Sequence, residues 1–289
     1  MKKRSPGRGR HYHLLRKLNE TILSHLFFRN WPAHLWNLVP GAAEVSIIRR
    51  SHALPSGGDA SCRMVFLSDL HIGPTTPEPL LENVFSHIRA LQPDILLLGG
   101  DYVFLEAKAS SLAMLSRLVA SIVSSAKYAV LGNHDLWTHD GRIVDALQTA
   151  GTTVLVNQSR TLPPPWKNFT VAGLDDTYAG NCDGKAAFSK FSDSPATIVL
   201  CHSPDGLLHI GNHRFTYFLC GHTHGGQIAT PWAPIITPVG RLSRRFSAGF
   251  FHVDSGEVFV SRGIGGVEVP VRWHAPADIL CLDFVKKSV

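Results

Sequence analysis

Long hydrophobic runs and paired cysteines are both missing from this sequence. No stretch approaches the about 20 consecutive apolar residues that a membrane-spanning helix needs. The five cysteines have no paired spacing, which argues against a disulfide framework and favours a reducing compartment. The first 30 residues are not typical of a signal peptide, because Arg16, Lys17 and Glu20 interrupt any hydrophobic core. We therefore expect a globular, cytoplasmic protein.

Net charge is nearly absent outside the N-terminal segment. Residues 1–60 carry ten Lys and Arg against three Asp and Glu, a net charge of +7, whereas the other 229 residues carry 18 and 19. Nucleic-acid enzymes usually have a basic stripe beside the active site, so no nucleic-acid partner is expected. The basic charge points instead to a role of the segment itself.

The N-terminal segment has the pattern of an amphipathic helix behind a basic head. Its apolar residues recur at spacings of three and four, as on one helix face: Leu14, Leu15, Leu18, Ile22, Leu23, Leu26 and Phe27. Two interpretations remain open. The helix packs on the domain behind a basic leader, or residues 1–38 rest on an anionic membrane surface, which would place the protein peripherally on the inner face of the cell membrane.

The remaining chain alternates predicted strands and helices. A linker at 55–59, rich in Pro, Ser and Gly, separates an N-terminal segment (1–60) from a catalytic domain (61–289). We predict strands at 44–50, 63–67, 94–98, 128–131, 152–156, 169–172, 196–201 and 215–219, helices at 80–91, 112–123 and 140–150, and a hairpin at 249–253 and 257–260. The fold class is therefore α/β.

Five of these strands end in polar residues that could bind metal. In chain order these residues are Asp69 and His71, Asp101, Asn133, His202, and His222 with His224. Ligands bind beyond the carboxyl ends of strands in open α/β sheets, and residues i and i+2 of an extended backbone point to one side. Two Asp, one Asn and four His are too many for one zinc site and suit two metals.

The ordered pattern resembles the calcineurin-like metallophosphoesterase family over residues 63–285. It reads Asp69-X-His71, Gly100-Asp101, Gly132-Asn133-His134-Asp135, His202, Gly221-His222-X-His224. The resemblance implies a four-layer αββα sandwich of two mixed β-sheets, although a single doubly wound sheet fits the first 150 residues equally well. There is one departure, because Phe104 stands where family members often have a second Asp.

Two further stretches, 172–176 and 261–265, resemble one bacterial branch of the family. Its members are described as membrane-associated phosphodiesterases, and some cleave UDP-2,3-diacylglucosamine in lipid A synthesis. On this resemblance Arg262 is a candidate substrate-binding residue. The apolar loop 230–236 either folds over its own core or contacts acyl chains, and the second possibility makes Trp232 another candidate.

The resemblance also implies roles for the individual ligands. Asp69, His71 and His224 would hold one divalent metal, and Asn133, His202 and His222 the other. Asp101 would bridge them, since a carboxylate offers two acceptor oxygens. Nitrogen and oxygen ligands without thiolate suit Mn²⁺, with Fe or Zn²⁺ as alternatives.

The implied reaction is hydrolysis of a phosphodiester or pyrophosphate bond in a small-molecule or lipid substrate. A hydroxide shared by two cations would attack phosphorus. His134 would stabilise or protonate the leaving oxygen, and Asp135 would orient the His134 imidazole. The alternatives are a soluble nucleotide phosphodiesterase or nuclease and, from another class, a non-catalytic binding scaffold.

Overall fold

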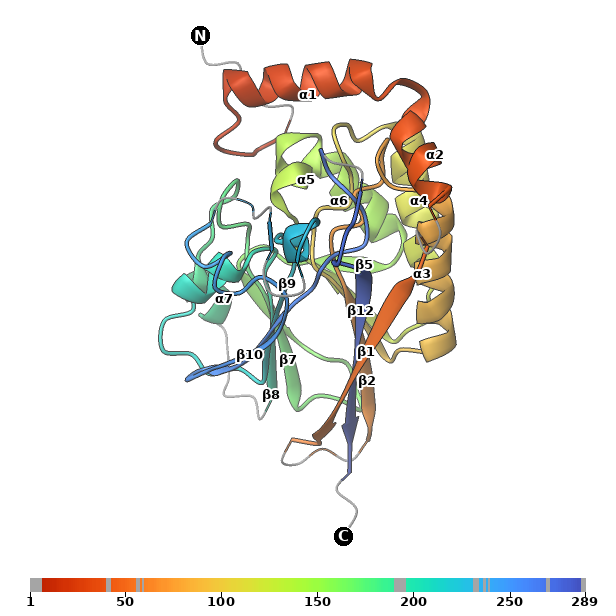
Figure 1. Cartoon of the computed structure of the whole chain (residues 1–289). Helices are drawn as coiled ribbons and strands as arrows, with labels where there is room; N and C mark the ends of the chain where they lie inside the picture. The colour runs from red at the N-terminus through yellow and green to blue at the C-terminus, as the bar shows by residue number, and fades with distance from the viewer. Residues whose placement is uncertain are drawn as a thin grey trace.

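Two six-stranded sheets pack face to face between outer helices (Figure 1). The computed structural model describes residues 7–39, 43–55, 58, 60–189, 196–230, 234–235, 238, 240–268 and 271–286. Both sheets are mixed, because each contains parallel and antiparallel neighbours. The four-layer αββα fold expected from the resemblance is confirmed, and the alternative of a single doubly wound sheet is not what forms.

The first sheet contains strands from both ends of the chain. Its order is β1 (Val45–Ala53), β12 (Ala277–Val285), β2 (Cys62–Leu67), β3 (Ile95–Leu98), β4 (Ala126–Ala129) and β5 (Thr152–Val154). The helices on this side are α3 (Glu78–Leu91), α4 (Ala109–Ala120), α5 (Asn133–Trp137) and α6 (Asp140–Thr149). Strand β1 belongs to the N-terminal segment 1–60, so that segment completes the sheet of the catalytic domain.

The second sheet is built from the middle and the last third of the chain. Its order is β10 (Gly249–Val253), β11 (Gly256–Val260), β9 (Tyr217–Cys220), β8 (Ala196–Leu200), β7 (Phe169–Gly173) and β6 (Gln158–Thr161). The short helix α7 (Gly184–Phe188) covers its outer face (Figure 1). The predicted hairpin is present as β10 and β11.

Alternating side chains of the strands bind the layers together. In β2, Met64 and Phe66 point into the apolar layer between the sheets, whereas Val65 and Leu67 pack beneath the helices. The Phe66 ring meets Phe259 of the second sheet edge to face, with centroids 6.3 Å apart. A strand buried on both faces has no polar alternation, which explains the continuous apolar runs in the sequence.

The N-terminal segment forms α1 (Leu14–Leu26), a single 3-10 turn (Phe28–Asn30) and α2 (Trp31–Asn37). Helix α1 lies across the end of the molecule where the loops meet, above α5 (Figure 1). It packs on the domain, but mainly through its polar face: Leu14 and Leu15 are 82% and 79% exposed, and of the helix residues only Leu23 is buried. The helix therefore packs on the domain, as the first interpretation has it, but its apolar stripe faces outward.

The residues before α1 form a strap along the domain. The Arg8 guanidinium donates to both carboxylate oxygens of buried Asp175 at 2.7 and 2.8 Å. Burial opposes ionisation, but the Arg8 hydrogen bond lowers the pKa of Asp175 below its ordinary value. The backbone N–H of Arg10 donates to the carbonyl of Ala179 at 2.7 Å. Asp140 is the first residue of α6, and its carboxylate accepts a hydrogen bond from the backbone N–H of Arg8. Within the described residues, no helix has the length and hydrophobicity to cross a membrane.

The layer between the sheets can be tested by removing one ring. Phe259→Ala should lower the free energy of unfolding by about 3–5 kcal/mol, because it leaves a cavity at a fully buried position. The control Val123→Ala, at a side chain that is 90% exposed, should change it by less than about 0.5 kcal/mol. Urea denaturation followed by circular dichroism measures both. A similar small effect for the two variants would contradict a shared core between the sheets.

Candidate metal centre

The candidate ligands lie just beyond the carboxyl ends of five strands. Asp69 and His71 follow β2, Asp101 follows β3, Asn133 follows β4, His202 follows β8, and His222 and His224 follow β9. Three strands belong to the first sheet and two to the second, so the site bridges the sheets. All seven side chains are buried.

The backbone of these loops differs from the extended conformation that the sequence suggested. Five candidate ligands have positive φ: Asp69 (57°), His71 (44°), Asp101 (54°), His222 (69°) and His224 (53°). Non-glycine residues adopt this left-handed region rarely, at a cost of about 1–3 kcal/mol each, and such strain gathers at functional sites. The side chains thus converge because the loops turn sharply, and not because the strands continue.

Two glycines make room for the carboxylates. A Cβ on Gly221 would collide with the Asp69 carboxylate, and a Cβ on Gly132 would collide with that of Asp101. The Gly residues of the motifs therefore serve close packing at these two positions.

The first group of candidate ligands is Asp69, His71 and His224. The Nε2 atoms of His71 and His224 are 3.1 Å apart. Asp69 Oδ1 lies 3.8 Å from the first and 3.4 Å from the second. One atom from each side chain therefore faces a common point, as ligands of one ion do.

The second group is Asp101, His202 and His222. His202 Nε2 is 3.1 Å from Asp101 Oδ2 and 3.3 Å from His222 Nδ1. Asp101 Oδ2 also lies 3.6 Å from His71 Nε2 of the first group. Asp101 Oδ2 thus lies within 4 Å of a ring nitrogen in each of the two groups.

Asn133 supplies the test of whether the site fits metal. Its Oδ1 atom is buried and has no hydrogen-bond partner within the described structure, although Asn133 lines the same cavity as Asp101 and His222. A buried amide oxygen without a partner costs free energy that a cation ligated there would recover. With two carboxylates and four imidazoles beside it, the donor set fits divalent metals.

The charges in the cluster are unevenly compensated. Burial raises the pKa of Asp69 to about 6 and lowers that of His71 to about 4. Burial opposes ionisation of Asp101 too, but His202 and His134 bring its pKa well below the ordinary value. Closely packed acceptors of this kind favour a cation between them.

His134 and Asp135 occupy different surroundings. The His134 ring stands edge-on to His71 with centroids 5.0 Å apart, and it lines the cavity. The sequence predicted that Asp135 orients this imidazole. Its carboxylate oxygens instead accept from the backbone N–H groups of Asp101, Tyr102 and Gly132 at 2.8, 2.8 and 3.0 Å. Asp135 therefore fixes the loops that carry Asp101 and Asn133.

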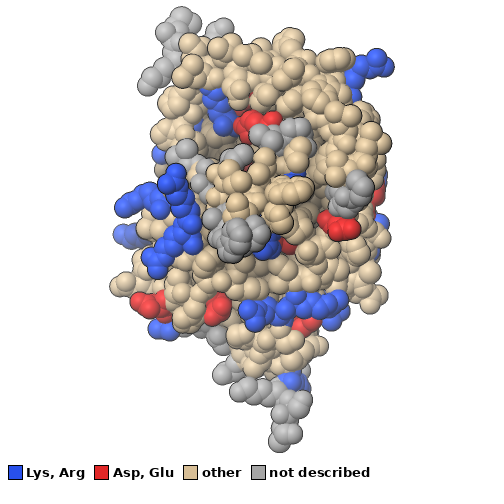
Figure 2. Space-filling view, in the orientation of Figure 1, with Lys and Arg blue, Asp and Glu red and all other residues tan. Residues whose placement is uncertain are grey.

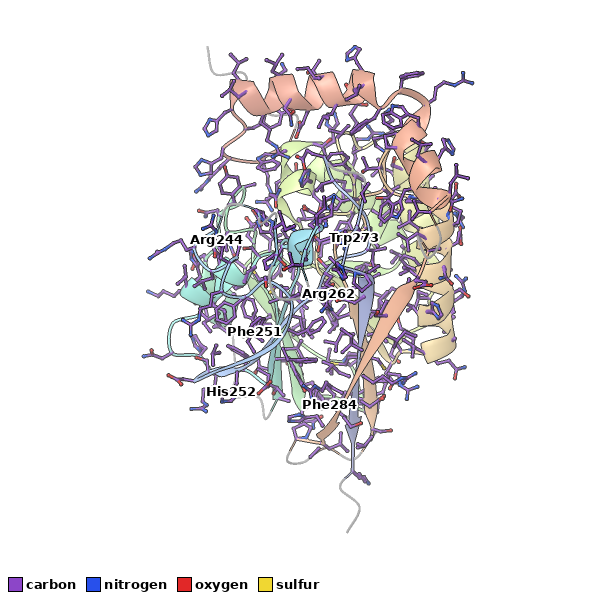
Figure 3. All side chains as sticks on the ribbon, viewed as in Figure 1. Arg244, Phe251, His252, Arg262, Trp273 and Phe284 are labelled. Carbon is purple, nitrogen blue, oxygen red and sulfur yellow. The ribbon has the colours of Figure 1, made fainter. Side chains whose placement is uncertain are left out.

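The two predicted substrate-binding residues have different outcomes. The Arg262 guanidinium pairs with buried Asp278 at 3.1 Å, and the residue lies near the end of the sheets that faces α1, opposite to Phe284 (Figure 3). Trp232 lies outside the described residues. The neighbouring Arg272 is half-buried and donates to backbone carbonyls, and its Nη2 is 3.3 Å from His224 Nδ1.

A cavity of about 330 Å³ opens beside the cluster. Its wall contains Asp101, Asn133, His134, His222 and His224 together with one arginine, Arg16 of α1. In the sequence, Arg16 is one of the basic residues of the N-terminal segment, with no sign of a place in the active site. The signal for its inward position was Glu20, one helical turn later, which pairs with it at 3.0 Å.

Several known proteins are similar to this chain over most of its length. The family model described as "Calcineurin-like phosphoesterase" matches residues 62–226. Phosphodiesterase YaeI of Escherichia coli is 30% identical over 83% of this chain and 88% of its own. An uncharacterized metallophosphoesterase of Bacillus subtilis, YkuE, is 31% identical over 80% and 81%. The UDP-2,3-diacylglucosamine pyrophosphatase LpxG of Chlamydia trachomatis is 27% identical over 76% and 82%.

The match covers more than half of the chain and includes every strand that carries a candidate ligand. Divalent metals are used throughout the family, and the clustered side chains here provide sites for them. The chain is a metal-dependent hydrolase and belongs to the calcineurin-like phosphoesterase family.

Proposed function

We propose that this protein hydrolyses a phosphodiester or pyrophosphate bond in a lipid-linked substrate at the inner membrane surface. The observation that carries the proposal is the position of helix α1 directly beside the candidate metal centre. A cluster of seven candidate metal ligands lies beneath a helix whose apolar residues face outward. UDP-2,3-diacylglucosamine, named for the relative LpxG, is a substrate with both features, an acylated sugar and a diphosphate.

The candidate ligands divide between two ions, for which we propose Mn²⁺, with Fe or Zn²⁺ as alternatives. Asp69, His71 and His224 would hold one, Asn133, His202 and His222 the other, and Asp101 both. Two divalent cations supply a water of lowered pKa and neutralise phosphoryl oxygens. His134 lies at the cavity wall, where its imidazole can donate a proton to the leaving oxygen.

The membrane part of the proposal rests on α1. Leu14, Leu15, Leu18, Ile22 and Leu26 are each more than half exposed. Figure 2 shows the top of the molecule, where α1 lies, as mainly uncharged, with a Lys or Arg side chain at its right edge. Apolar side chains that enter a bilayer contribute favourable free energy to membrane binding, and each basic residue near an anionic surface adds about 1 kcal/mol.

The substrate class is tested by three assays in parallel. The protein loaded with Mn²⁺ is given bis-p-nitrophenyl phosphate, UDP-N-acetylglucosamine and UDP-2,3-diacylglucosamine. We expect the diacylated substrate to have the highest kcat/KM, because it alone offers acyl chains to the membrane face. Equal rates on both nucleotide sugars would favour a soluble nucleotide phosphodiesterase instead.

His134→Ala and Asp101→Asn should fail in different ways. His134→Ala should keep the metal content of the wild type and lose about 10²–10⁴-fold in kcat, because it removes a proton donor. Asp101→Asn should lose metal, because it removes the charge shared by both groups. Elemental analysis with steady-state kinetics separates the two.

His209→Ala, at an exposed histidine outside the cluster, is the control and should leave both quantities unchanged. Wild-type turnover in His134→Ala would remove the role assigned to this side chain.

Membrane binding should depend on the outward face of α1. The triple variant Leu14→Ser, Leu15→Ser, Leu18→Ser should weaken sedimentation with phosphatidylglycerol vesicles at least about tenfold, since each buried leucine contributes about 1.5–3 kcal/mol. About half-molar salt should weaken it further by screening the basic residues. Point changes are preferable to deleting residues 1–38, because Leu23, Phe27 and Trp36 are buried.

The matched control is Val123→Ser with Leu208→Ser, two exposed apolar side chains outside α1. It should bind vesicles like the wild type. Unchanged binding of the triple variant would exclude α1 as the membrane contact.

A further inference from the structure

We propose that Arg16 of α1 is a substrate-binding residue that holds the second phosphate of a diphosphate substrate, next to His134. This inference rests on the proposed phosphohydrolase function and narrows it to pyrophosphate bonds. It also gives α1 two functions, one on each face: its apolar side meets the membrane, and its polar side completes the active site.

Arg16 reaches the reaction centre from outside the matched family region. Its Nη2 atom lies 3.4 Å from both ring nitrogens of His134. Equal distances mean that the guanidinium is not aligned with one nitrogen lone pair, so this contact leaves its N–H groups available to another acceptor. Arg16 and His134 therefore form one continuous stretch of the cavity wall.

The side chain of Arg16 is held in place before any substrate binds. Its guanidinium carbon lies 3.7 Å from the centre of the Trp137 ring, and its Nε donates to Glu20 at 3.0 Å. Tyr12 in turn donates to the other Glu20 oxygen at 2.7 Å. A stacked and hydrogen-bonded guanidinium loses little conformational entropy on binding an anion, which is why arginine suits phosphate recognition.

Enough donors remain for a phosphate. Glu20 occupies the Nε donor, and within the described structure the Nη1 group has no partner. Glu268 lies 3.8 Å from Nη2, too far for a hydrogen bond. Two N–H groups of the planar fork can therefore reach one anion together.

The position of α1 is fixed at both of its ends. Arg8 and Asp175 anchor the strap before the helix. Leu23 and Phe27, at its other end, pack on the buried Phe104 ring. Phe104 also lies against His134, with ring centroids 5.5 Å apart, so the residue that departs from the family pattern supports both α1 and the imidazole.

The choice of a diphosphate follows from charge. One phosphoryl group can occupy the cluster around Asp101, and His134 faces the oxygen that leaves. In a pyrophosphate the leaving oxygen belongs to a second phosphate, which then lies beyond His134, beside Arg16. A leaving group without phosphate would place no anion between the guanidinium and the metal ions, where like charges repel.

The test compares Arg16→Ala and Arg16→Lys with wild type on two substrates, UDP-N-acetylglucosamine and bis-p-nitrophenyl phosphate. Arg16→Ala should lower kcat/KM on the diphosphate about ten- to a hundredfold, the range for a hydrogen bond to a charged group. The fold loss on the diester should be smaller than that on the diphosphate by a factor of at least about five. Arg16→Lys should recover part of the loss. Added guanidinium should restore Arg16→Ala on the diphosphate. Arg10→Ala, in the same segment but paired with Asn181, is the control.

Calorimetric binding of inorganic pyrophosphate gives a readout that does not need turnover. Arg16→Ala should weaken it about tenfold or more and orthophosphate binding less. If the wild type hydrolyses neither of these substrates nor UDP-2,3-diacylglucosamine, the proposed function fails, and pyrophosphate binding still decides the role of Arg16. Equal losses on both substrates, or unchanged pyrophosphate binding, would overturn the inference and leave Arg16 as a support for His134.

Discussion

The position of one carboxylate, that of Asp101, determines how the rest of the site is built. One of its oxygens accepts the backbone N–H of His134 at 2.9 Å, and the other faces His202 and His71 at 3.1 and 3.6 Å. A buried carboxylate is costly unless its charge is matched, so the loops around it must bring positive groups close. The absent side chain of Gly132 and the left-handed backbone at Asp101 itself are consequences of that requirement.

Helix α1 reverses the usual orientation of an amphipathic helix. An apolar stripe normally faces the core, but here Arg16 and Glu20 face the domain while Leu14 and Leu15 face outward. The contacts of Arg16 at the cavity, and the packing of Leu23 and Phe27 on Phe104, hold the helix in place. The chain thereby joins an active site shared with its family to a surface that its own N-terminal segment supplies.

The sequence predicted the strands and the seven converging side chains, because apolar runs that end at polar residues are a local pattern. It did not predict strand β12, which is the last strand of the chain and as long as β1, or the short β6. Nor could it orient α1, since amphipathicity says which residues share a face but not which face packs. The role of Asp135 was open to prediction: a carboxylate three residues after Gly132 is placed to accept its backbone N–H, as in a capping box.

The width of helix α1 also sets the distance between a membrane surface and the active site. A helix with its side chains is about 10–12 Å across, and its leucines and Arg16 stand on opposite sides. A bilayer resting on the leucines would lie roughly one helix diameter from the guanidinium. A lipid could keep its acyl chains in the membrane only if its headgroup extends that far before the phosphate. The helix would then select substrates by headgroup length. Lipids with long sugar-nucleotide headgroups could reach the site, and lipids whose phosphate lies at the membrane surface could not.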